Sequence, residues 1–210
     1  MPSGEEKFSQ EEMTANFDIS RVSLGGPIFD TEKLDWLNGK YIREDLDDEE
    51  FIQRFAAWAF KSDKVKMIAP LLKQRVERLS DVASLGSFFF SGELDISAES
   101  FAHKNIEADE ILKIVQFTLW KLELIEQWDR DSIEKQLQEL AAQLELKIRD
   151  FLFPLFVAIS GKAVSTSVIE SINILGIDIT RARLRKALDV LGGISKKQAK
   201  SLEREFRDFG

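Results

Sequence analysis

Apolar residues recur every three to four positions over most of this chain, which is the spacing expected for one face of an amphipathic helix. Gly161, Gly176 and the pair Gly192 and Gly193 interrupt that spacing, as glycines do where helices end. No alternation of apolar and polar residues has the length of a convincing strand, with 91–96 as the nearest approach. The pattern therefore predicts an all-α fold.

Capping signals and breaks in the spacing define the expected helices. Ser9 with Glu12 forms a capping box, and Asp30 stands where an N-cap residue accepts hydrogen bonds from free N–H groups. The acidic residues 45–50 suit the positive N-terminal end of a further helix. We expect helices at about 9–17, 30–43, 45–60, 63–79, 107–127, 131–144, 147–158, 165–175, 178–191 and 194–207.

The chain is expected to have three segments, and two apolar stretches of the second segment are expected to be buried. A connecting segment, 1–47, precedes two helical subdomains, 48–129 and 130–210, because charges near Asp129 interrupt the apolar spacing. The phenylalanines at 88–90 form an apolar linker that should pack inside. The helix before Phe60 should bury a face made of Phe51, Ile52, Phe55, Trp58 and Ala59.

Composition excludes several classes of protein. The 210 residues are 44% hydrophobic and 31% charged, which is ordinary for a globular protein. No apolar run is long enough to span a membrane, and no signal peptide is present. The absence of cysteine excludes disulfides and thiolate metal sites. We therefore expect a cytoplasmic protein with no metal site.

The net charge of −8 argues against general affinity for nucleic acid, but the charge is unevenly distributed. Residues 61–80 carry six basic and two acidic side chains, and residues 151–210 carry ten and six. Local positive charge in an acidic protein suits selective binding of one RNA. Solvated helix faces are the alternative explanation for both segments.

The segment from Gly25 to Arg43 has the most informative pattern. After the glycines, the expected helix carries a narrow apolar sector and, beside it, a stripe in which a tryptophan alternates with cations. Such a stripe suits stacking on a base while the charges hold phosphates. A half-buried tryptophan on a surface helix is the plainer reading. The residues of this stripe are Lys33, Trp36, Lys40 and Arg43.

The run W-L-N-G-K-Y-I-R at 36–43 resembles bacterial glutamyl-tRNA synthetases, which have W-x-N-G-x-Y-I-R at the entry to their anticodon-binding half. The runs S-R-V-S-L-G-G-P-I-F-D at 20–30 and F-P-L-F-V-A-I-S-G-K-A-V-S at 153–165 also resemble that family, in the same order. The resemblance covers nearly the whole chain. It implies the C-terminal, helical, anticodon-binding half of a class I enzyme that attaches glutamate to its tRNA.

The resemblance also implies that the catalytic half is missing. That half carries an H-x-G-H-type motif and a K-x-S-K-type loop, and it uses ATP and magnesium. His103 is the sole histidine, and it has no partner at such a spacing. The run I-S-K-K-Q at 194–198 is similar to the second loop, but it follows two glycines and opens an amphipathic run. We therefore expect it to form the first turn of the last helix, and we expect no catalytic residue and no cofactor in this chain.

Arg75 matches the family arginine that reads the third anticodon base. On the helix expected at 63–79, it would face away from Leu72 and Val76, and its planar fork can make two parallel hydrogen bonds. A surface ion pair with Glu77 or Asp81 is the structural alternative.

The loop after Gly161 is the second expected site, because small hydroxyls suit hydrogen bonds to unstacked loop bases. The resemblance assigns the reading of the first two anticodon bases to this loop; capping of the next helix by Ser165 or Thr166 is compatible with that role. Phe156 stands where the family has an arginine, so Lys162 or Arg181 is expected to supply the missing charge. The expected tRNA-binding residues of this region are Phe156, Lys162, Ser165, Thr166 and Val168.

A further basic cluster, Arg181, Arg183, Arg185 and Lys186, could hold phosphates, although helical spacing directs Arg183 away from Arg181 and Arg185. Together these features predict a monomer that binds the glutamate tRNA at its anticodon stem-loop. Two alternatives remain open: a stand-alone helical RNA-binding protein, and a helical scaffold for protein interactions with no role in aminoacylation.

Overall fold

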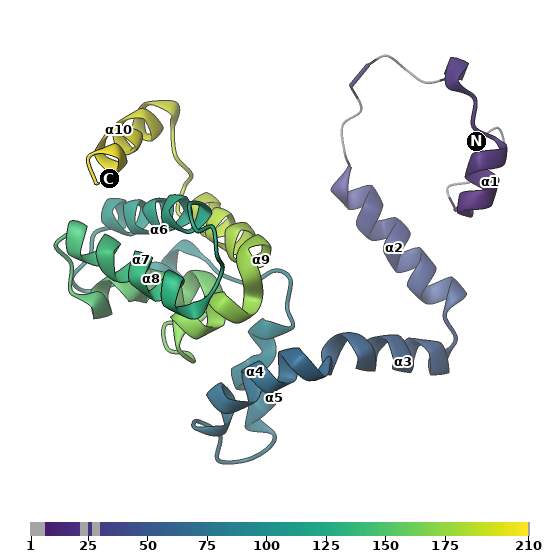
Figure 1. Ribbon diagram of the computed structural model, residues 1–210, viewed down its shortest axis with the longest axis horizontal. Coiled ribbons are helices and arrows are strands. Elements are labelled where there is room, and N and C mark those ends of the chain that lie inside the picture. The colour runs from purple at the N-terminus through teal and green to yellow at the C-terminus, as the bar shows by residue number, and fades with distance from the viewer. Residues whose placement is uncertain (1–6, 22–24, 27–29, 210) are drawn as a thin grey trace. The chain divides into compact units, whose positions relative to one another are not determined.

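The computed structural model describes residues 7–21, 25–26 and 30–209, which form two units, Met1–Lys61 and Ser62–Gly210 (Figure 1). Every regular element in these ranges is helical. The prediction of an all-α fold is therefore confirmed. The three predicted segments remain a prediction, and the structure itself divides between Lys61 and Ser62.

The described residues of the first unit form three α-helices and a 3₁₀ turn, and their caps are those the sequence predicts. Ser9 and Glu12 form a capping box, and the Asp30 carboxylate accepts a hydrogen bond of 2.9 Å from the backbone N–H of Lys33. Asp47 caps the third helix through the N–H of Glu50. The elements are α1 (Gln10–Ala15), η1 (Ile19–Arg21), α2 (Thr31–Asp45) and α3 (Asp48–Ala59).

The apolar face of α3 is a correction to the sequence analysis. Ala59 alone of the five expected residues is buried, while Phe51, Ile52, Phe55 and Trp58 are exposed. The rings still pack along the helix, since the centroids of Phe51 and Phe55 lie 6.4 Å apart. A single amphipathic helix buries such a face only where another element covers it.

The second unit contains the core. Four helices, α6 (Ala108–Glu123), α7 (Arg130–Gln143), α8 (Ile148–Ser160) and α9 (Val168–Val190), pack on one another. They enclose side chains with no exposed surface, among them Phe117, Leu137, Phe151 and Ile172. Burial of each such side chain contributes about 1.5–3 kcal/mol. Residues on both sides of Asp129 share this core.

The elements of this unit run in order from α4 to α10. They are α4 (Ser62–Lys73), α5 (Asp81–Gly86), η2 (Ser87–Phe89), η3 (Ala98–Phe101), α6 (Ala108–Glu123), α7 (Arg130–Gln143), α8 (Ile148–Ser160), α9 (Val168–Val190) and α10 (Lys196–Arg207). Phe88 and Phe89 are buried, as predicted for the linker at 88–90. Residues 91–96 form a loop rather than a strand.

Three helix boundaries show how local signals act. Gly176 has a non-helical φ of 79° inside α9 and produces a kink there. The kink separates the two helices that the sequence predicts at 165–175 and 178–191. Helix α10 begins after Ser195, which forms a capping box with Gln198, so the run at 194–198 is a helix start as predicted. Helix α4 ends at Lys73, six residues before the predicted end at Leu79.

Candidate functional site

A groove of about 400 Å³ in the second unit brings together residues from four parts of the sequence. Arg75 contributes from the turn after α4, and Phe156 contributes from α8. Ser165, with two small loop residues before it, completes the side next to α9. Three residues predicted to bind RNA therefore face one cavity, although they come from separate segments of the chain.

Three further residues line the same groove and were not predicted as site residues: His103, Arg149 and Phe153. Arg149, Phe153 and Phe156 stand at positions i, i+4 and i+7 of α8, so they share one face of that helix. This spacing was present in the sequence as a signal. It combines one cation with two aromatic rings, the residue types that bind a base and a phosphate.

His103 packs against the aromatic face of the groove. Its ring centroid lies 4.5 Å from that of Phe153, with the two planes inclined by 44°. Its Nδ1 accepts a hydrogen bond from the backbone N–H of Asn105, and its Nε2 lies 3.9 Å from a carboxylate oxygen of Asp150. The imidazole therefore packs against one of the two aromatic rings that line the groove.

Arg75 lies in a turn rather than on a helix, because α4 ends two residues before it. Its backbone N–H donates to the carbonyl of Leu72 at 2.8 Å. The predicted alternative partner Asp81 accepts hydrogen bonds from the backbone N–H groups of Glu77 and Arg78. Within the described residues, the Arg75 guanidinium has no ion pair with Glu77 or Asp81, and it remains available to a ligand.

The electrostatic character of the groove follows from what lines it. Arg75 and Arg149 are exposed, and neither side chain forms a hydrogen bond or ion pair in the part of the chain that the structure describes. No carboxylate is among the residues that line the groove. By contrast, Arg130 pairs with Glu134 and Glu170. Two unneutralised guanidinium groups and two aromatic rings make this groove suited to an anion with a planar ring.

The loop before α9 is held by hydrogen bonds to the first residues of that helix. The hydroxyls of Thr166 and Ser171 lie 3.0 Å apart and are buried, and the Val168 side chain is buried as the first residue of α9. Ser167, rather than Ser165 or Thr166, is the N-cap. The side chains of Thr166 and Val168 therefore stabilise the loop, and their contact with RNA remains a prediction.

The two cations expected to replace the missing family arginine have partners elsewhere. The Lys162 ammonium donates to the carbonyl oxygen of Ser84 at 2.7 Å. Arg181 lies 2.9 Å from a carboxylate oxygen of Glu123, which also accepts from Arg185. Neither Lys162 nor Arg181 lines the groove, whereas Arg149 does.

The stripe on α2 has the predicted arrangement within the first unit. The Lys40 ammonium lies 5.2 Å from the ring centroid of Trp36, a cation–π geometry, and Trp36 is 46% exposed. A Cβ at Gly39 would lie 2.8 Å from the guanidinium of Arg43, so the glycine leaves the space that this guanidinium occupies. Lys33 is exposed one turn before Trp36.

Metal chemistry and membrane insertion find no support in the ranges described. These residues contain no cluster of three or more histidine, cysteine, aspartate or glutamate side chains with the geometry of a metal site. None of their helices is both long and apolar enough to cross a membrane.

Comparison with known proteins gives a consistent result. Residues 50–188 match the anticodon binding domain family. A glutamate–tRNA ligase of Marinobacter nauticus is 48% identical over 210 residues, which are 100% of this chain and 43% of that protein. A glutamate–tRNA ligase of Pseudomonas putida strain F1 is 50% identical, with 100% of this chain and 42% of that protein covered. The chain thus spans less than half the length of these relatives.

A solved structure supports the fold. The crystal structure of a glutamate tRNA ligase from Elizabethkingia meningosepticum superposes with a TM-score of 0.54 at 23% identity, over 90% of this chain and 38% of that one. At that identity the likeness concerns the arrangement of the helices.

Proposed function

We propose that this chain, which belongs to the anticodon binding domain family, binds the anticodon stem-loop of a tRNA and tests the identity of its bases in the groove of the second unit. The full-length protein would be a glutamate–tRNA ligase, as its relatives are. The ligand would be the tRNA for glutamate.

The proposal rests on the observation that the two arginines of the groove are not neutralised by acidic side chains in the described part of the chain. Arg75 and Arg149 face the groove and, among the residues that the structure describes, neither has an ion-pair partner and no carboxylate lines the groove. Surface arginines without neutralising acids attract phosphate, and a guanidinium can also bind a base edge through two parallel hydrogen bonds. The acidic remainder of the chain, with a net charge of −8, would limit binding of other polyanions.

The groove would hold an unstacked anticodon base. Phe156 and Phe153 present rings on which a base can stack, and Ser165, a largely buried residue that lines the same groove, would contact its edge. Arg75 would read the third anticodon base, and the loop at 165–168 would read the first two. Lys162, Thr166 and Val168 would act through the shape of that loop.

The first unit would contribute a second contact. Trp36 would stack on an unpaired base or ribose, while Lys33, Lys40 and Arg43 would bind phosphates. Gly39 would be needed to keep the Arg43 guanidinium against the helix.

The chemistry of glutamate activation would belong to a part of the protein outside this sequence. No catalytic residue is proposed here, and ATP and magnesium would be used by that other part. The chain itself would act as a monomer in the cytoplasm and without a cofactor.

The proposal is tested by fluorescence titration of the chain with a glutamate tRNA transcript and with a copy altered at the third anticodon base, each at two salt concentrations. Tryptophan fluorescence provides the intrinsic signal, to which Trp36 and Trp58 of the first unit both contribute. Preferential binding that weakens with salt is expected, because phosphate contacts release counterions. Equal binding of both RNAs, or none, would refute base reading by this chain and favour a helical scaffold for protein contacts.

A further inference from the structure

The turn that carries Arg75 and the helix that carries Phe156 belong to two layers of the second unit. Segment 62–91, which contains α4, α5 and η2, includes Arg75. Helix α8 carries Phe156, and the loop that contains Ser165 connects α8 to α9. Helix α9 packs on α4, and α8 packs on η2. The width of the groove therefore depends on how segment 62–91 sits on α8 and α9.

Cations from the α8–α9 side make the hydrogen bonds that cross between these layers. Arg183 of α9 donates to the carbonyl oxygen of Phe88 at 2.6 Å and to that of Ser91 at 2.5 Å. Lys162, which follows α8, donates to the carbonyl oxygen of Ser84 at 2.7 Å. Three charge-assisted bonds thus fasten the segment containing Arg75 to the helices on the other side of the groove.

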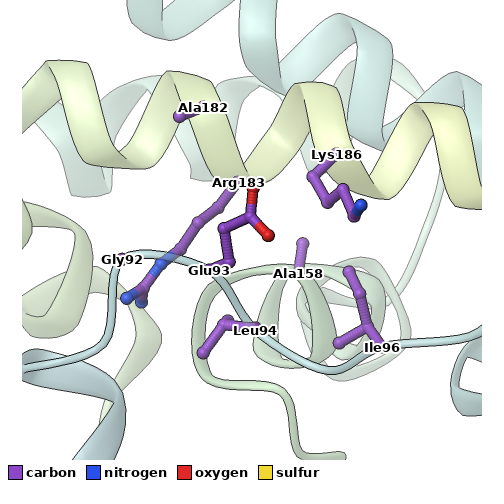
Figure 2. Close-up of a pocket in the computed structure, with 8 residues that line it drawn as sticks. All are labelled: Gly92, Glu93, Leu94, Ile96, Ala158, Ala182, Arg183 and Lys186. Atoms are coloured by element: carbon purple, nitrogen blue, oxygen red, sulfur yellow. The ribbon is translucent and has the colours of Figure 1, made fainter. Parts of the chain in front are cut away.

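Arg183 also fixes the end of α8. Its guanidinium donates to the carbonyl oxygen of Ile159, in the last turn of that helix, at 2.5 Å. Figure 2 shows its side chain running from α9 toward the loop at Gly92, beside a small cavity of about 70 Å³. One side chain therefore holds both layers at the point where α8 leads into the loop of the groove.

Arg183 is 3% exposed, and this burial lowers its pKa to about 10. Lys64 of α4 reinforces the same turn by donating to the carbonyl oxygen of Phe89 at 2.6 Å. Burial and the nearby Arg183 charge lower the pKa of Lys64. The burial of Arg183 and the partial burial of Lys64, which both donate to carbonyls of one short turn, cost desolvation free energy. Their hydrogen bonds are therefore weak evidence of a role in stability alone.

We propose that Arg183 and Lys162 are positioning residues for base reading, which set the separation between Arg75 on one wall of the groove and Phe156 and Ser165 on the other. The proposal rests on the proposed function of the groove. Bidentate recognition requires placement to within about 0.5 Å, so looser docking lowers the preference for the correct base more than it lowers general RNA affinity.

The first test uses Lys162→Met, which removes one tether at an exposed position, and Arg183→Lys, which keeps the charge and loses the fork. Lys135→Met is the matched control, since Lys135 is an exposed lysine of α7 whose partner is Glu139. Binding is titrated against the glutamate tRNA transcript and the copy altered at its third anticodon base. The preference is expected to fall about threefold to tenfold in both test variants and to stay unchanged in the control, with the salt dependence unaltered.

The salt dependence separates a tether from a direct contact. If Lys162 bound phosphate itself, the slope of log affinity against log salt would decrease by about 0.7 in Lys162→Met, and the proposal would be overturned for that residue. Unchanged preference in both variants, in a chain whose Arg75→Ala variant loses it, would overturn the proposal while leaving the proposed function intact.

A second readout needs no RNA. Because the chain lacks cysteine, Gln74→Cys and Val164→Cys accept two spin labels across the groove without background labelling, and both positions are exposed. The distribution of distances between the labels is expected to broaden in Lys162→Met and Arg183→Lys and not in Lys135→Met. An unchanged distribution would refute the positioning role even if wild-type chain failed to bind tRNA. Should Arg183→Lys fail to fold, the tRNA titration and the distance measurement are both made with Lys162→Met.

Discussion

Arg75 and Phe156 line one groove, the first from the turn after α4 and the second from the middle of α8. One offers an exposed planar cation that has no ion pair within the described part of the chain, and the other offers a half-buried ring. A base stacked on the ring would share the groove with a group that can form two hydrogen bonds to a base edge. The two residues can therefore separate affinity, which comes from stacking, from discrimination, which comes from the guanidinium.

Replacement of Arg75 should remove discrimination. Arg75→Ala is expected to lower the preference for the native third anticodon base by about 1–3 kcal/mol, or roughly fivefold to 150-fold. Arg75→Lys should retain most of the affinity and lose most of the preference, because an ammonium lacks the planar fork. Titration with the two tRNA transcripts measures both quantities. Arg78→Ala, at a neighbouring exposed arginine outside the groove, is the control, and an equal loss there would contradict a specific role for Arg75.

Loss of the Phe156 ring should weaken binding of both transcripts. Phe156→Ala is expected to lower affinity by about 1–3 kcal/mol, the contribution of one stacked base, with the preference between transcripts nearly unchanged. Leu152→Ala provides the comparison, since Leu152 is also a half-buried residue of α8 that packs on the core but does not line the groove. Equal affinity losses in the two variants would show that Phe156 acts through packing alone.

The α2 stripe should contribute affinity without base preference. Trp36→Ala removes the ring that lies 5.2 Å from the Lys40 ammonium, and it is expected to weaken tRNA binding about fivefold to tenfold. Leu34→Ala removes an apolar side chain of similar exposure from the same helix. An equilibrium titration of each variant with the glutamate tRNA transcript at low salt compares the two changes. Identical tRNA affinities of Trp36→Ala and Leu34→Ala would exclude Trp36 from the interface.

Gly161 should be intolerant of a side chain. It ends α8 with a φ of 75°, where any residue with a Cβ is strained, so Gly161→Ala should lower the free energy of unfolding by about 1–2 kcal/mol. Gly92→Ala is the matched change at a glycine with open space around it. Chemical unfolding followed by circular dichroism compares the two, and an equally stable Gly161→Ala would show that the backbone relaxes at no cost.

Acid should destabilise the second unit partly through Asp129. Its carboxylate accepts a hydrogen bond from the backbone N–H of Ser132 at the start of α7, and this bond lowers its pKa. Because the folded pKa lies below the unfolded one, the stabilisation is fully present above the ordinary aspartate pKa of about 3.9 and is lost as the pH falls through the lowered value.

Asp129→Asn keeps an acceptor at the cap and removes the titration. The melting temperature of this variant is expected to fall less than that of the wild-type chain between pH 5 and about pH 2. Thermal unfolding at several pH values measures the difference, and parallel curves would contradict a role of this carboxylate in acid sensitivity.

Much of the fold could be predicted because its signals are local. The caps at Ser9, Asp30 and Ser195, and the break at Gly176, depend on a few neighbouring residues and appear where expected. The end of α4 was predicted wrongly. The apolar spacing of Val76 and Leu79 continued past Lys73, but the chain turns there, and Asp81 accepts from two backbone N–H groups of that turn.

The site was only partly predictable, because the groove is formed by tertiary packing. Arg75 and Ser165 were found through a resemblance, while Arg149 and Phe153 needed only the i, i+4, i+7 spacing on α8 that also contains Phe156. His103 reaches Phe153 from another loop, which no local pattern indicates. The hydrogen-bond partner of Lys162 could not be predicted either, because the acceptor is a backbone carbonyl, which every residue has.

The acceptors of Arg183 and Lys162 are all main-chain oxygens of residues 84–91 and of Ile159. Every amino acid supplies the same carbonyl, so Ser84 and Ser91 can be substituted during evolution without loss of these hydrogen bonds. The constraint falls on the two donors instead. Homologous chains with the same groove geometry should therefore vary at Ser84 and Ser91 while retaining a cation at positions 162 and 183, a correlation that sequence comparison across the family can measure.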